Sequence, residues 1–331
     1  MKSYLIGRPA DIRRVYPGET LAVLQAEAGL DSTHILTKET LPEASAADAD
    51  ILFSTWGMPL LTEEEIGRYF PHLKAVFYAA GTVQGFARPF LSRGIRVFSA
   101  WGANAVPVAE FAVSQILLAN KGFFQAAVLN GTGRVKAARD HAARFPGNVR
   151  CRVGIIGAGM IGSMVIRMLR AHAPDVLVFD PFLSPERAAD LGVRLCPLEE
   201  LFSECQTVSN HLANNPQTAG MLNYALFSRM PDNGVFINTG RGAQVVEADL
   251  VRALTERPDR TALLDVTSPE PPEPGHPFYR MPNVFLTPHI AGSTGHEVER
   301  MSAYMLDEFR RVRRGESPLY EVTLSMLDTM A

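Results

Sequence analysis

The stretch Arg152-Val153-Gly154-Ile155-Ile156-Gly157-Ala158-Gly159-Met160-Ile161-Gly162 decides how this chain folds. Its apolar run, 153–156, is typical of a buried strand, and residues 163–171 continue with helical composition. The glycines between them follow the pattern GxGxxG. In that pattern the first glycine permits a tight turn, the second lets the backbone approach a pyrophosphate, and the third lets the helix pack on the strand. The stretch therefore predicts a dinucleotide-binding strand, turn and helix.

A carboxylate follows the next predicted strand. The apolar residues 176–179 lead into Asp180, which lies 18 positions after Gly162 (180 − 162). A carboxylate at this place accepts hydrogen bonds from a ribose 2′-hydroxyl and repels a 2′-phosphate. We therefore predict NAD as the cofactor rather than NADP. The alternative is that the glycines form an ordinary turn and that Asp180 caps the loop at Pro181.

Short apolar runs alternate with helical patterns along most of the chain. Strands separated by helices form parallel sheets with helices on both faces, so we predict an α/β fold of two doubly wound parallel-sheet domains. Residues 101–295 are assigned to a Rossmann domain that binds NAD. Residues 1–100 plus 296–331 are assigned to a flavodoxin-like substrate domain. The predicted strands are 3–7, 34–36, 51–54, 75–78 and 96–99 in the first sheet, and 152–156, 176–179, 207–211, 234–238, 261–264 and 284–286 in the second.

Helical patterns fill the intervals between these strands. Residues 20–28 and 63–70 have helical composition, and Thr62 is a predicted N-cap followed by three glutamates. Residues 106–130 are mostly apolar on more than one face, which predicts a long helix buried on several sides. The polar segment 134–147 is expected to be an exposed connection. Residues 295–314 are predicted to form a helix that returns to the first domain.

The composition excludes several classes of protein. Hydrophobic residues make up 47% of the 331 and charged residues 20%, which fits a folded globular protein. The formal net charge of −3 gives no basic field for nucleic acid or for an anionic membrane. No uninterrupted apolar stretch of bilayer-spanning length is evident. Three cysteines without metal-ligand spacing predict reduced thiols, a cytoplasmic location and no metal site.

Arg241 lies between two glycines in Asn238-Thr239-Gly240-Arg241-Gly242, directly after a predicted strand. Ligands of open α/β sheets bind at the carboxyl ends of the strands. A guanidinium there can hold a carboxylate through two hydrogen bonds and polarise a neighbouring carbonyl. Arg241 is therefore a predicted binder of a 2-keto or 2-hydroxy acid. Alternatively, it is a surface arginine paired with an acid.

His289 follows another predicted strand, in Leu286-Thr287-Pro288-His289. Reduction of a keto group needs a proton as hydride arrives, and an imidazolium supplies one near neutral pH. Glu270, in a proline-rich loop, could bond the second ring nitrogen and hold the histidine charged and oriented. Without such a partner, a histidine at this place is more often structural. Asp265 is a further acid on this edge and could bond the nicotinamide carboxamide, and His211 is a weaker candidate for a position facing the cofactor.

At these residues the chain resembles the D-isomer-specific 2-hydroxyacid dehydrogenases, over essentially its full length and most strongly from Trp101 to Gly292. The family includes D-lactate, glyoxylate/hydroxypyruvate and 3-phosphoglycerate dehydrogenases. The resemblance implies Arg241 as the substrate binder and Glu270 with His289 as the acid/base pair. A formate dehydrogenase, which pairs its histidine with glutamine, is disfavoured because position 270 is glutamate. The motifs that carry the resemblance are Asn104 with Val108-Ala109-Glu110, Gly157–Gly162 with Asp180, residues 198–202, 238–242, 264–271 and 288–292.

The resemblance also implies further contacts. The motifs and the resemblance together predict a set of residues that line the cofactor. These residues are Gly157, Gly159, Met160, Ile161, Gly162, Asp180, His211, Asn215, Pro216, Thr239, Gly240, Arg241, Asp265, His289 and Gly292. Backbone at Ala80, Gly81 and Thr82 is implied to meet the substrate carboxylate in a cleft between the domains. Trp56, after the strand 51–54, either lines this pocket or is a buried aromatic residue.

The resemblance implies a homodimer in which a helical arm, here 104–130, packs across the partner. The sequence departs from many relatives in 81–85 and in Ala213-Asn214-Asn215, so a substrate cannot be transferred from any one of them. The absence of a Lys and Arg cluster in 54–59 and 80–86 disfavours a phosphorylated 2-keto acid. A rival function is that of the family's NAD-sensing transcriptional corepressors, which bind partners through the same fold.

Overall fold

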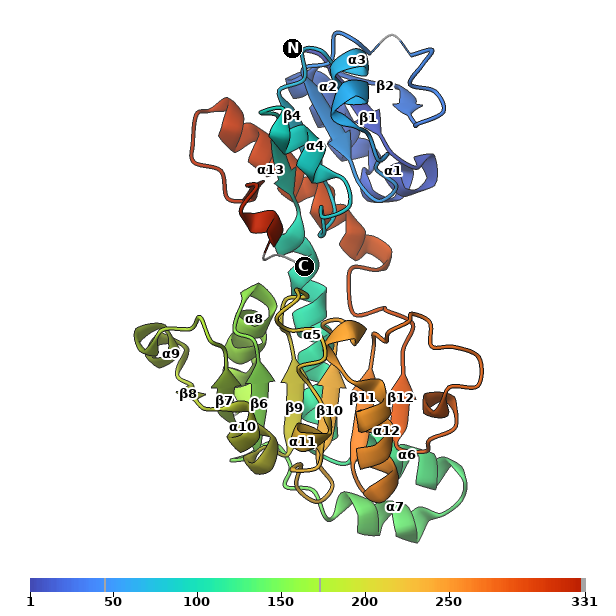
Figure 1. The fold of residues 1–331 in the computed structure, drawn as a ribbon, viewed down its shortest axis with the longest axis vertical. Helices are drawn as coiled ribbons and strands as arrows, with labels where there is room; N and C mark the ends of the chain where they lie inside the picture. The colour runs from blue at the N-terminus through green and yellow to red at the C-terminus, as the bar shows by residue number, and fades with distance from the viewer. Residues whose placement is uncertain (45, 173, 329–331) are drawn as a thin grey trace. The chain divides into compact units, whose positions relative to one another are not determined.

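The computed structural model describes residues 1–44, 46–172 and 174–328, which form two compact units. Unit 1 comprises Met1–Ala105 and Ser293–Ala331, and unit 2 comprises Val106–Gly292. The last three positions of the predicted substrate domain, 329–331, lie outside the described residues. Each unit is built on one sheet with helices on both of its faces (Figure 1). The predicted α/β class with two doubly wound sheets is confirmed.

Unit 1 contains a six-stranded sheet with the order β13-β5-β4-β3-β1-β2. All its neighbouring strands run parallel except the edge pair β13–β5. The strands are β1 (Ser3–Ile6), β2 (Leu30–Leu36), β3 (Ile51–Ser54), β4 (Ala75–Tyr78), β5 (Arg96–Ser99) and β13 (Glu321–Val322). The helices are α1 (Pro9–Val15), α2 (Gly18–Ala28), α3 (Glu63–Tyr69), α4 (Ala87–Ser92) and α13 (Glu299–Arg313). Strand β2 begins four residues before the predicted 34–36, and β13 was not predicted.

Aromatic side chains hold α13 against this sheet. Phe77 and Phe98 stack with ring centroids 4.6 Å apart. Phe309 of α13 meets Phe77 edge-on at 5.8 Å, and all three side chains are buried. Such stacked and edge-to-face pairs add to the free energy gained by burying the rings. This packing explains how the C-terminal helix, predicted over 295–314, becomes part of the first unit.

Unit 2 contains a seven-stranded, all-parallel sheet with the order β12-β11-β10-β9-β6-β7-β8. Strand order reverses between β6 and β9, which is the switch point where ligands of doubly wound sheets bind. The strands are β6 (Arg152–Ile156), β7 (Asp175–Phe179), β8 (Arg194–Leu195), β9 (Thr207–Asn210), β10 (Val235–Asn238), β11 (Thr261–Leu264) and β12 (Val284–Leu286). Figure 1 shows this sheet with α10 (Leu198–Glu204), α11 (Tyr224–Phe227) and α12 (Glu247–Glu256) in front of it.

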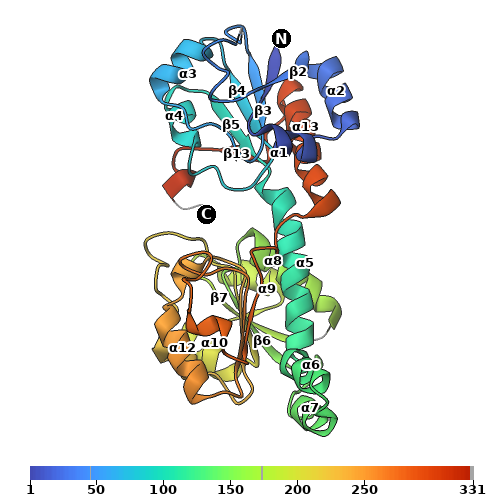
Figure 2. The ribbon, with the colours of Figure 1, turned by 90° about the vertical axis from the view of Figure 1, so that its right-hand side faces the viewer.

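The other face of the second sheet packs against α5 (Trp101–Ala119), α8 (Met160–Leu169) and α9 (Pro185–Leu191). Helix α5 continues through a turn into α6 (Phe123–Gly131) and α7 (Val135–Ala142), as Figure 2 shows. The predicted single helix over 106–130 is therefore two helices. The prediction of burial on several sides holds for α5 but is wrong for α6, which has no buried residue in this chain. The predicted exposed connection 134–147 contains α7, where Ala138 and His141 are buried.

Among the described residues, one helix, α5, is long and apolar enough to cross a bilayer by length and composition alone. It is not an uninterrupted apolar stretch, because Asn104, Glu110, Ser114 and Gln115 lie within it, so the expectation from the sequence is not contradicted. In its most apolar stretch, 56% is buried inside the structure, as in the core helix of a globular protein.

Candidate active site

The glycines of the fingerprint lie at the switch point of the second sheet. Gly157 has φ +86°, and a Cβ there would come within 2.9 Å of the carbonyl oxygen of His211. A Cβ on Gly162 would come within 1.9 Å of the carbonyl oxygen of Gly157, so helix α8 can start here only without a side chain. Gly159 is different, because a Cβ on it would meet no atom within 4 Å. The turn thus leaves open space at the glycine that the pattern assigns to a pyrophosphate.

Asp180 contacts this turn directly. Its Oδ2 accepts a hydrogen bond of 2.7 Å from the N–H of Ala158, and its Oδ1 accepts one of 2.8 Å from Phe182. The carboxylate is half-buried. Asp180 therefore caps the loop after β7, as the alternative from the sequence proposed. It also lies beside the GxGxxG turn. Each oxygen keeps acceptor capacity for a ligand, since a carboxylate oxygen accepts more than one hydrogen bond.

Among the described residues directly after β9 and β10, two side-chain polar atoms are buried without a hydrogen-bond partner. They are Nδ1 of His211 and Oγ1 of Thr239, at the ends of β9 and β10. Nε2 of His211 lies 2.9 Å from Oγ of Ser209, and burial lowers the pKa of His211 to about 4. Buried polar atoms normally have hydrogen-bond partners. The orphaned atoms, the open space at Gly159 and the uncapped start of α8 all fit a bound dinucleotide.

The remaining residues predicted for the cofactor lie on the same strand ends. Met160 occupies the exposed first turn of α8, followed by Ile161. Asn215 uses its own Oδ1 to accept from the N–H groups of Gln217 and Thr218, which shapes the loop after β9, and Pro216 is exposed in that loop. Gly240 follows Thr239 after β10 and Gly292 follows the histidine loop after β12. The parallel order of the second sheet thus brings the loops after β9, β10 and β12 to the same edge of that sheet.

Arg241 follows β10 and is half-buried. Its Nη1 donates to the carbonyl oxygen of Gly240 at 2.8 Å. Within the described part of the chain Arg241 forms no ion pair, so the alternative of a surface arginine paired with an acid is not what the structure contains. Its backbone is held by two buried side chains, Asn238 and Gln244. Gln244 was not singled out from the sequence, where its polar side chain among Gly242-Ala243 and Val245-Val246 was the available signal.

His289 and Glu270 are brought together. Nδ1 of His289 lies 2.7 Å from Oε1 of Glu270, and the two side chains are 47% and 42% exposed. A hydrogen bond through Nδ1 leaves Nε2 directed elsewhere and accessible to a ligand. His289 has φ +54°, a left-handed conformation that is unfavourable for residues with a side chain. Strain of this kind is found where the surroundings fix a residue for function.

The buried carboxylate of Asp265 holds the histidine loop. Its Oδ1 accepts from Oγ1 of Thr287 and from the N–H of Ile290, and its Oδ2 accepts from the N–H of Ala291. The carbonyl oxygen of Asp265 also accepts from the N–H of His289 at 3.0 Å. The structure therefore gives Asp265 a positioning role, and the predicted contact with a carboxamide could use only its remaining acceptor capacity.

A second acid, Glu247, supports the loop that carries Glu270. Its Oε1 accepts from the N–H of Ser268 at 2.7 Å, and its Oε2 lies 3.5 Å from Nε2 of His276. These two residues lie on either side of Glu270 in the sequence. Burial raises the pKa of Glu247. Glu247 was not singled out from the sequence, where it is one of several acids at the start of a helix.

The residues predicted for the substrate in unit 1 lie at the carboxyl ends of β3 and β4. Ala80 is fully buried, and Oγ of Ser99 donates to its carbonyl oxygen at 2.9 Å. Gly81 and Thr82 follow at the surface. Trp56 is half-buried against the core of unit 1, with the guanidinium of Arg14 5.3 Å from its ring centroid. Contact of these four residues with a substrate stays a prediction.

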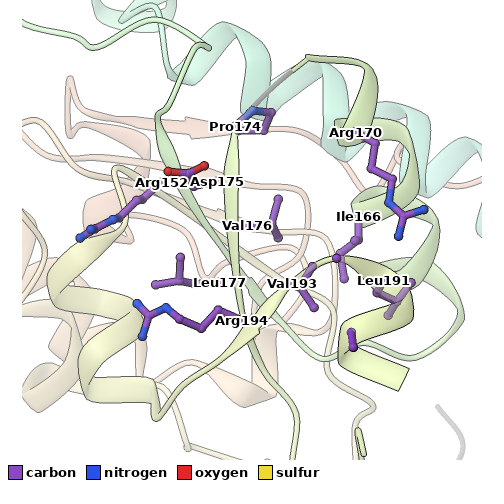
Figure 3. A pocket seen from close by; sticks show the side chains of 12 residues that line it. Arg152, Ile166, Arg170, Pro174, Asp175, Val176, Leu177, Leu191, Val193 and Arg194 are labelled. Atoms are coloured by element: carbon purple, nitrogen blue, oxygen red, sulfur yellow. The ribbon is translucent and has the colours of Figure 1, made fainter. Parts of the chain in front are cut away.

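The cavity in Figure 3, of about 480 Å³, lies elsewhere. It is lined by Arg152 and Asp175, the first residues of β6 and β7, and so lies at the amino ends of these strands. Two of its arginines, Arg152 and Arg194, pair with Glu204 at 2.8 and 3.1 Å. The positive charges of these two arginines are thus compensated by Glu204. Because the cavity lies at the amino ends of the strands, it is separate from the residues described above, which follow the carboxyl ends.

Comparisons with known proteins identify the family of the chain. Residues 113–291, more than half of the chain, match the D-isomer specific 2-hydroxyacid dehydrogenase, NAD binding domain. A D-3-phosphoglycerate dehydrogenase from Archaeoglobus fulgidus is 35% identical over 204 residues, which are 61% of this chain. The match takes in only 38% of that relative's length. A glyoxylate reductase from Korarchaeum cryptofilum is 30% identical over 273 residues, or 82% of each protein.

A solved structure, D-lactate dehydrogenase with NAD+ from Lactobacillus jensenii, is similar with a TM-score of 0.76. The superposition covers 98% of this chain and 100% of that one, at 20% sequence identity. At this identity the likeness concerns the fold alone.

Proposed function

The chain belongs to the D-isomer specific 2-hydroxyacid dehydrogenase family, and from this premise we propose that it is an NAD-dependent oxidoreductase that interconverts a 2-keto acid and a D-2-hydroxy acid. The observation that carries the proposal is the 2.7 Å contact between His289 and Glu270. It lies at the strand ends of the same sheet that presents the GxGxxG turn. A general acid and a nucleotide fingerprint on one edge are the two parts that carbonyl reduction requires.

The chemistry of the chain's own residues follows from their contacts. Bound NADH supplies the hydride. Nε2 of His289 donates a proton to the keto oxygen, while Nδ1–H stays hydrogen-bonded to the carboxylate of Glu270. That carboxylate stabilises the imidazolium and fixes the direction of the ring. In the reverse direction the same nitrogen accepts the hydroxyl proton.

Arg241 is proposed to bind the substrate carboxylate and polarise its carbonyl group. The support is its position directly after β10 and the lack of an ion pair among the described residues. A guanidinium without an acidic partner can form two parallel hydrogen bonds to an incoming carboxylate. The backbone at Ala80, Gly81 and Thr82 and the side chain of Trp56 are proposed as further substrate contacts, on the resemblance alone.

NAD is proposed in preference to NADP. Asp180 lies at the end of β7, where its Oδ2 is held by the fingerprint turn. A negative charge there repels a 2′-phosphate and accepts from a 2′-hydroxyl. Residues 101–295 would form the NAD-binding domain, and residues 1–100 plus 296–331 the substrate domain. The family match over 113–291 supports the first of these assignments.

A homodimer is proposed through the helical arm 104–130. The support is a set of apolar side chains that are exposed in the single chain, Leu118, Phe123 and Val128.

A cytoplasmic location is proposed from the cysteines. Cys151, Cys196 and Cys205 are free thiols, and burial raises the pKa of Cys151 to about 12 and that of Cys196 to about 11. Such thiols are unreactive and need no oxidising compartment.

The test is oxidation of NADH followed by absorbance against a panel of 2-keto acids, with NADPH in parallel. The panel contains glyoxylate, hydroxypyruvate, pyruvate, a bulky apolar acid and a phosphorylated acid. We expect rapid oxidation of NADH with at least one unphosphorylated acid and much slower oxidation of NADPH. Tight NADH binding without oxidation on any acid would instead support an NAD-sensing scaffold.

A further inference from the structure

Three buried amide side chains fill the space between the carboxyl ends of β9 and β10. Asn210 ends β9, Asn238 ends β10, and Gln244 ends the short helix η2 (Gly242–Gln244). At most 1% of each residue is exposed. A buried amide is costly unless its donors and acceptors are paired. The partners of these three side chains therefore indicate what the cluster holds in place.

The first set of bonds joins the two strand ends. Nδ2 of Asn210 donates to Oδ1 of Asn238 at 3.0 Å and to Oε1 of Gln244 at 2.6 Å. Nε2 of Gln244 donates to the carbonyl oxygens of Leu212 and Ala213, both at 2.9 Å. Oδ1 of Asn210 accepts from the N–H of Leu212. The loop after β9 is thus fixed to the loop after β10.

The second set of bonds ends on Arg241. Its N–H donates to Oε1 of Gln244 at 3.2 Å, and its carbonyl oxygen accepts from Nδ2 of Asn238 at 3.1 Å. The N–H of the preceding Gly240 donates to Oδ1 of Asn238 at 3.1 Å. Both backbone polar groups of Arg241 are therefore bound by buried side chains, and every amide oxygen and nitrogen of the cluster has a partner.

We propose that Asn210, Asn238 and Gln244 form an amide clamp, a set of positioning residues that fixes the backbone of Arg241 so that its guanidinium meets the substrate carboxylate. The proposal rests on the proposed function of Arg241. Apolar side chains of similar volume would fill the same space but would leave the N–H groups of Gly240 and Arg241 without their acceptors. What a fully paired network adds is one defined arrangement of the backbone around it.

The variant that tests the clamp is Gln244→Leu, which keeps the volume and removes both the acceptor for Arg241 and the donors to Leu212 and Ala213. We expect the KM for the 2-keto acid to rise about tenfold or more, because the guanidinium loses its fixed position. The Kd for NADH should rise less than the KM, because Gln244 bonds Arg241 directly but reaches the cofactor loop only through the carbonyl oxygens of Leu212 and Ala213. Deuterium uptake should also rise in the peptides that contain Arg241, whose N–H has lost its buried acceptor.

Asn283→Leu is the matched control. Asn283 is likewise a buried amide of unit 2, and its Nδ2 donates to the carbonyl oxygens of Leu254 and Arg260 at 3.1 and 2.9 Å. It precedes β12, at the amino ends of the strands, away from Arg241. This variant should lose a similar amount of stability while its KM and the exchange at Arg241 match those of the wild type.

The two readouts separate the possible failures. Faster exchange at Arg241 with an unchanged KM would overturn the positioning role, and so would an equal rise of KM in Asn283→Leu. Unchanged exchange at Arg241 in Gln244→Leu would overturn the clamp itself. If the wild type reduced no 2-keto acid, the proposed function would fail, while deuterium uptake would still decide whether the clamp holds Arg241.

Discussion

Oε1 of Glu270 lies 2.7 Å from Nδ1 of His289, so the carboxylate and the imidazole form a pair whose other ring nitrogen is accessible. The two residues come from the loops after neighbouring strands, β11 and β12. The buried carboxylate of Asp265 holds the backbone on the C-terminal side of the histidine. Glu270 thereby orients the ring of the proposed proton donor, and Asp265 orients its loop.

Replacing His289 tests the proton donor. His289→Gln should lower kcat by about a thousandfold, since general acid catalysis contributes roughly 10²–10⁴ in rate. NADH binding, followed by fluorescence titration, should change little because the fingerprint turn is intact. A variant that turns over at the rate of the wild type would remove His289 from the mechanism.

Glu270→Gln gives the graded comparison. The amide oxygen can still accept from Nδ1–H, but it lacks the charge that stabilises the imidazolium. We therefore expect kcat to fall by about tenfold to a hundredfold, less than in His289→Gln. The double variant should be no slower than His289→Gln alone, because Glu270 acts through His289. Additive losses in steady-state kinetics would show that Glu270 has a separate role.

Asp180 is expected to set the choice between the two nicotinamide cofactors. Asp180→Asn removes the charge and keeps one of the two oxygens, so it retains only one of the two hydrogen bonds from the backbone N–H groups of Ala158 and Phe182. The ratio of kcat/KM for NADPH to that for NADH should rise by about tenfold or more. The melting temperature without cofactor serves as the control, and a large drop would indicate that the turn has been disturbed. An unchanged ratio in a stable variant would assign cofactor choice to another residue.

Two glycines of the fingerprint should respond in opposite ways to a methyl group. Gly162→Ala places a Cβ 1.9 Å from the carbonyl oxygen of Gly157 and should destabilise unit 2 by at least about 2 kcal/mol. Gly159→Ala meets no atom and should leave the melting temperature nearly unchanged. Its Kd for NADH should nevertheless rise about tenfold or more, because the methyl group occupies the approach of the pyrophosphate. Calorimetry and NADH titration measure the two effects separately, and normal NADH affinity in Gly159→Ala would place the pyrophosphate elsewhere.

His211 should make the cofactor-free protein sensitive to acid. Its pKa falls from 6.5 to about 4 in the folded state because of burial. Between these values the unfolded chain binds a proton that the folded chain does not, so the stability contributed by neutral His211 is present above pH 6.5 and is lost as pH falls. From pH 7.5 to 5 this loss amounts to about 2 kcal/mol. Urea unfolding at the two pH values should show a smaller loss in His211→Gln, and an equal loss in both proteins would contradict the assignment.

The sequence was sufficient where pattern and chemistry coincide locally. Strand β6 and the glycine turn were predicted because an apolar run, three glycines and a helical pattern stand next to one another. The pairing of Glu270 with His289 was also predictable in kind, since both follow strands expected to lie parallel in one sheet. The 2.7 Å distance between Nδ1 of His289 and Oε1 of Glu270 depends on the left-handed backbone of His289. No local sequence pattern predicts that backbone conformation.

The rest depends on partners that are distant in sequence. Strands β8 and β13 have two residues each. They are strands only through their pairing with β7 and β5, respectively. Helix α6 was predicted to be buried because its residues are apolar, yet within one chain nothing covers it fully. Asn210 and Gln244 were missed because a polar residue at a strand end is informative only once its partner, 34 positions away, is known.

The configuration of the product tests the central proposal most directly. The protein is incubated with NADH and hydroxypyruvate or another prochiral 2-keto acid that the panel selects, and the hydroxy acid is resolved by chiral chromatography. We predict only the D-2-hydroxy acid, in an amount equal to the NADH consumed. A racemic or L product, or consumption of NADH without any hydroxy acid, would contradict the proposal.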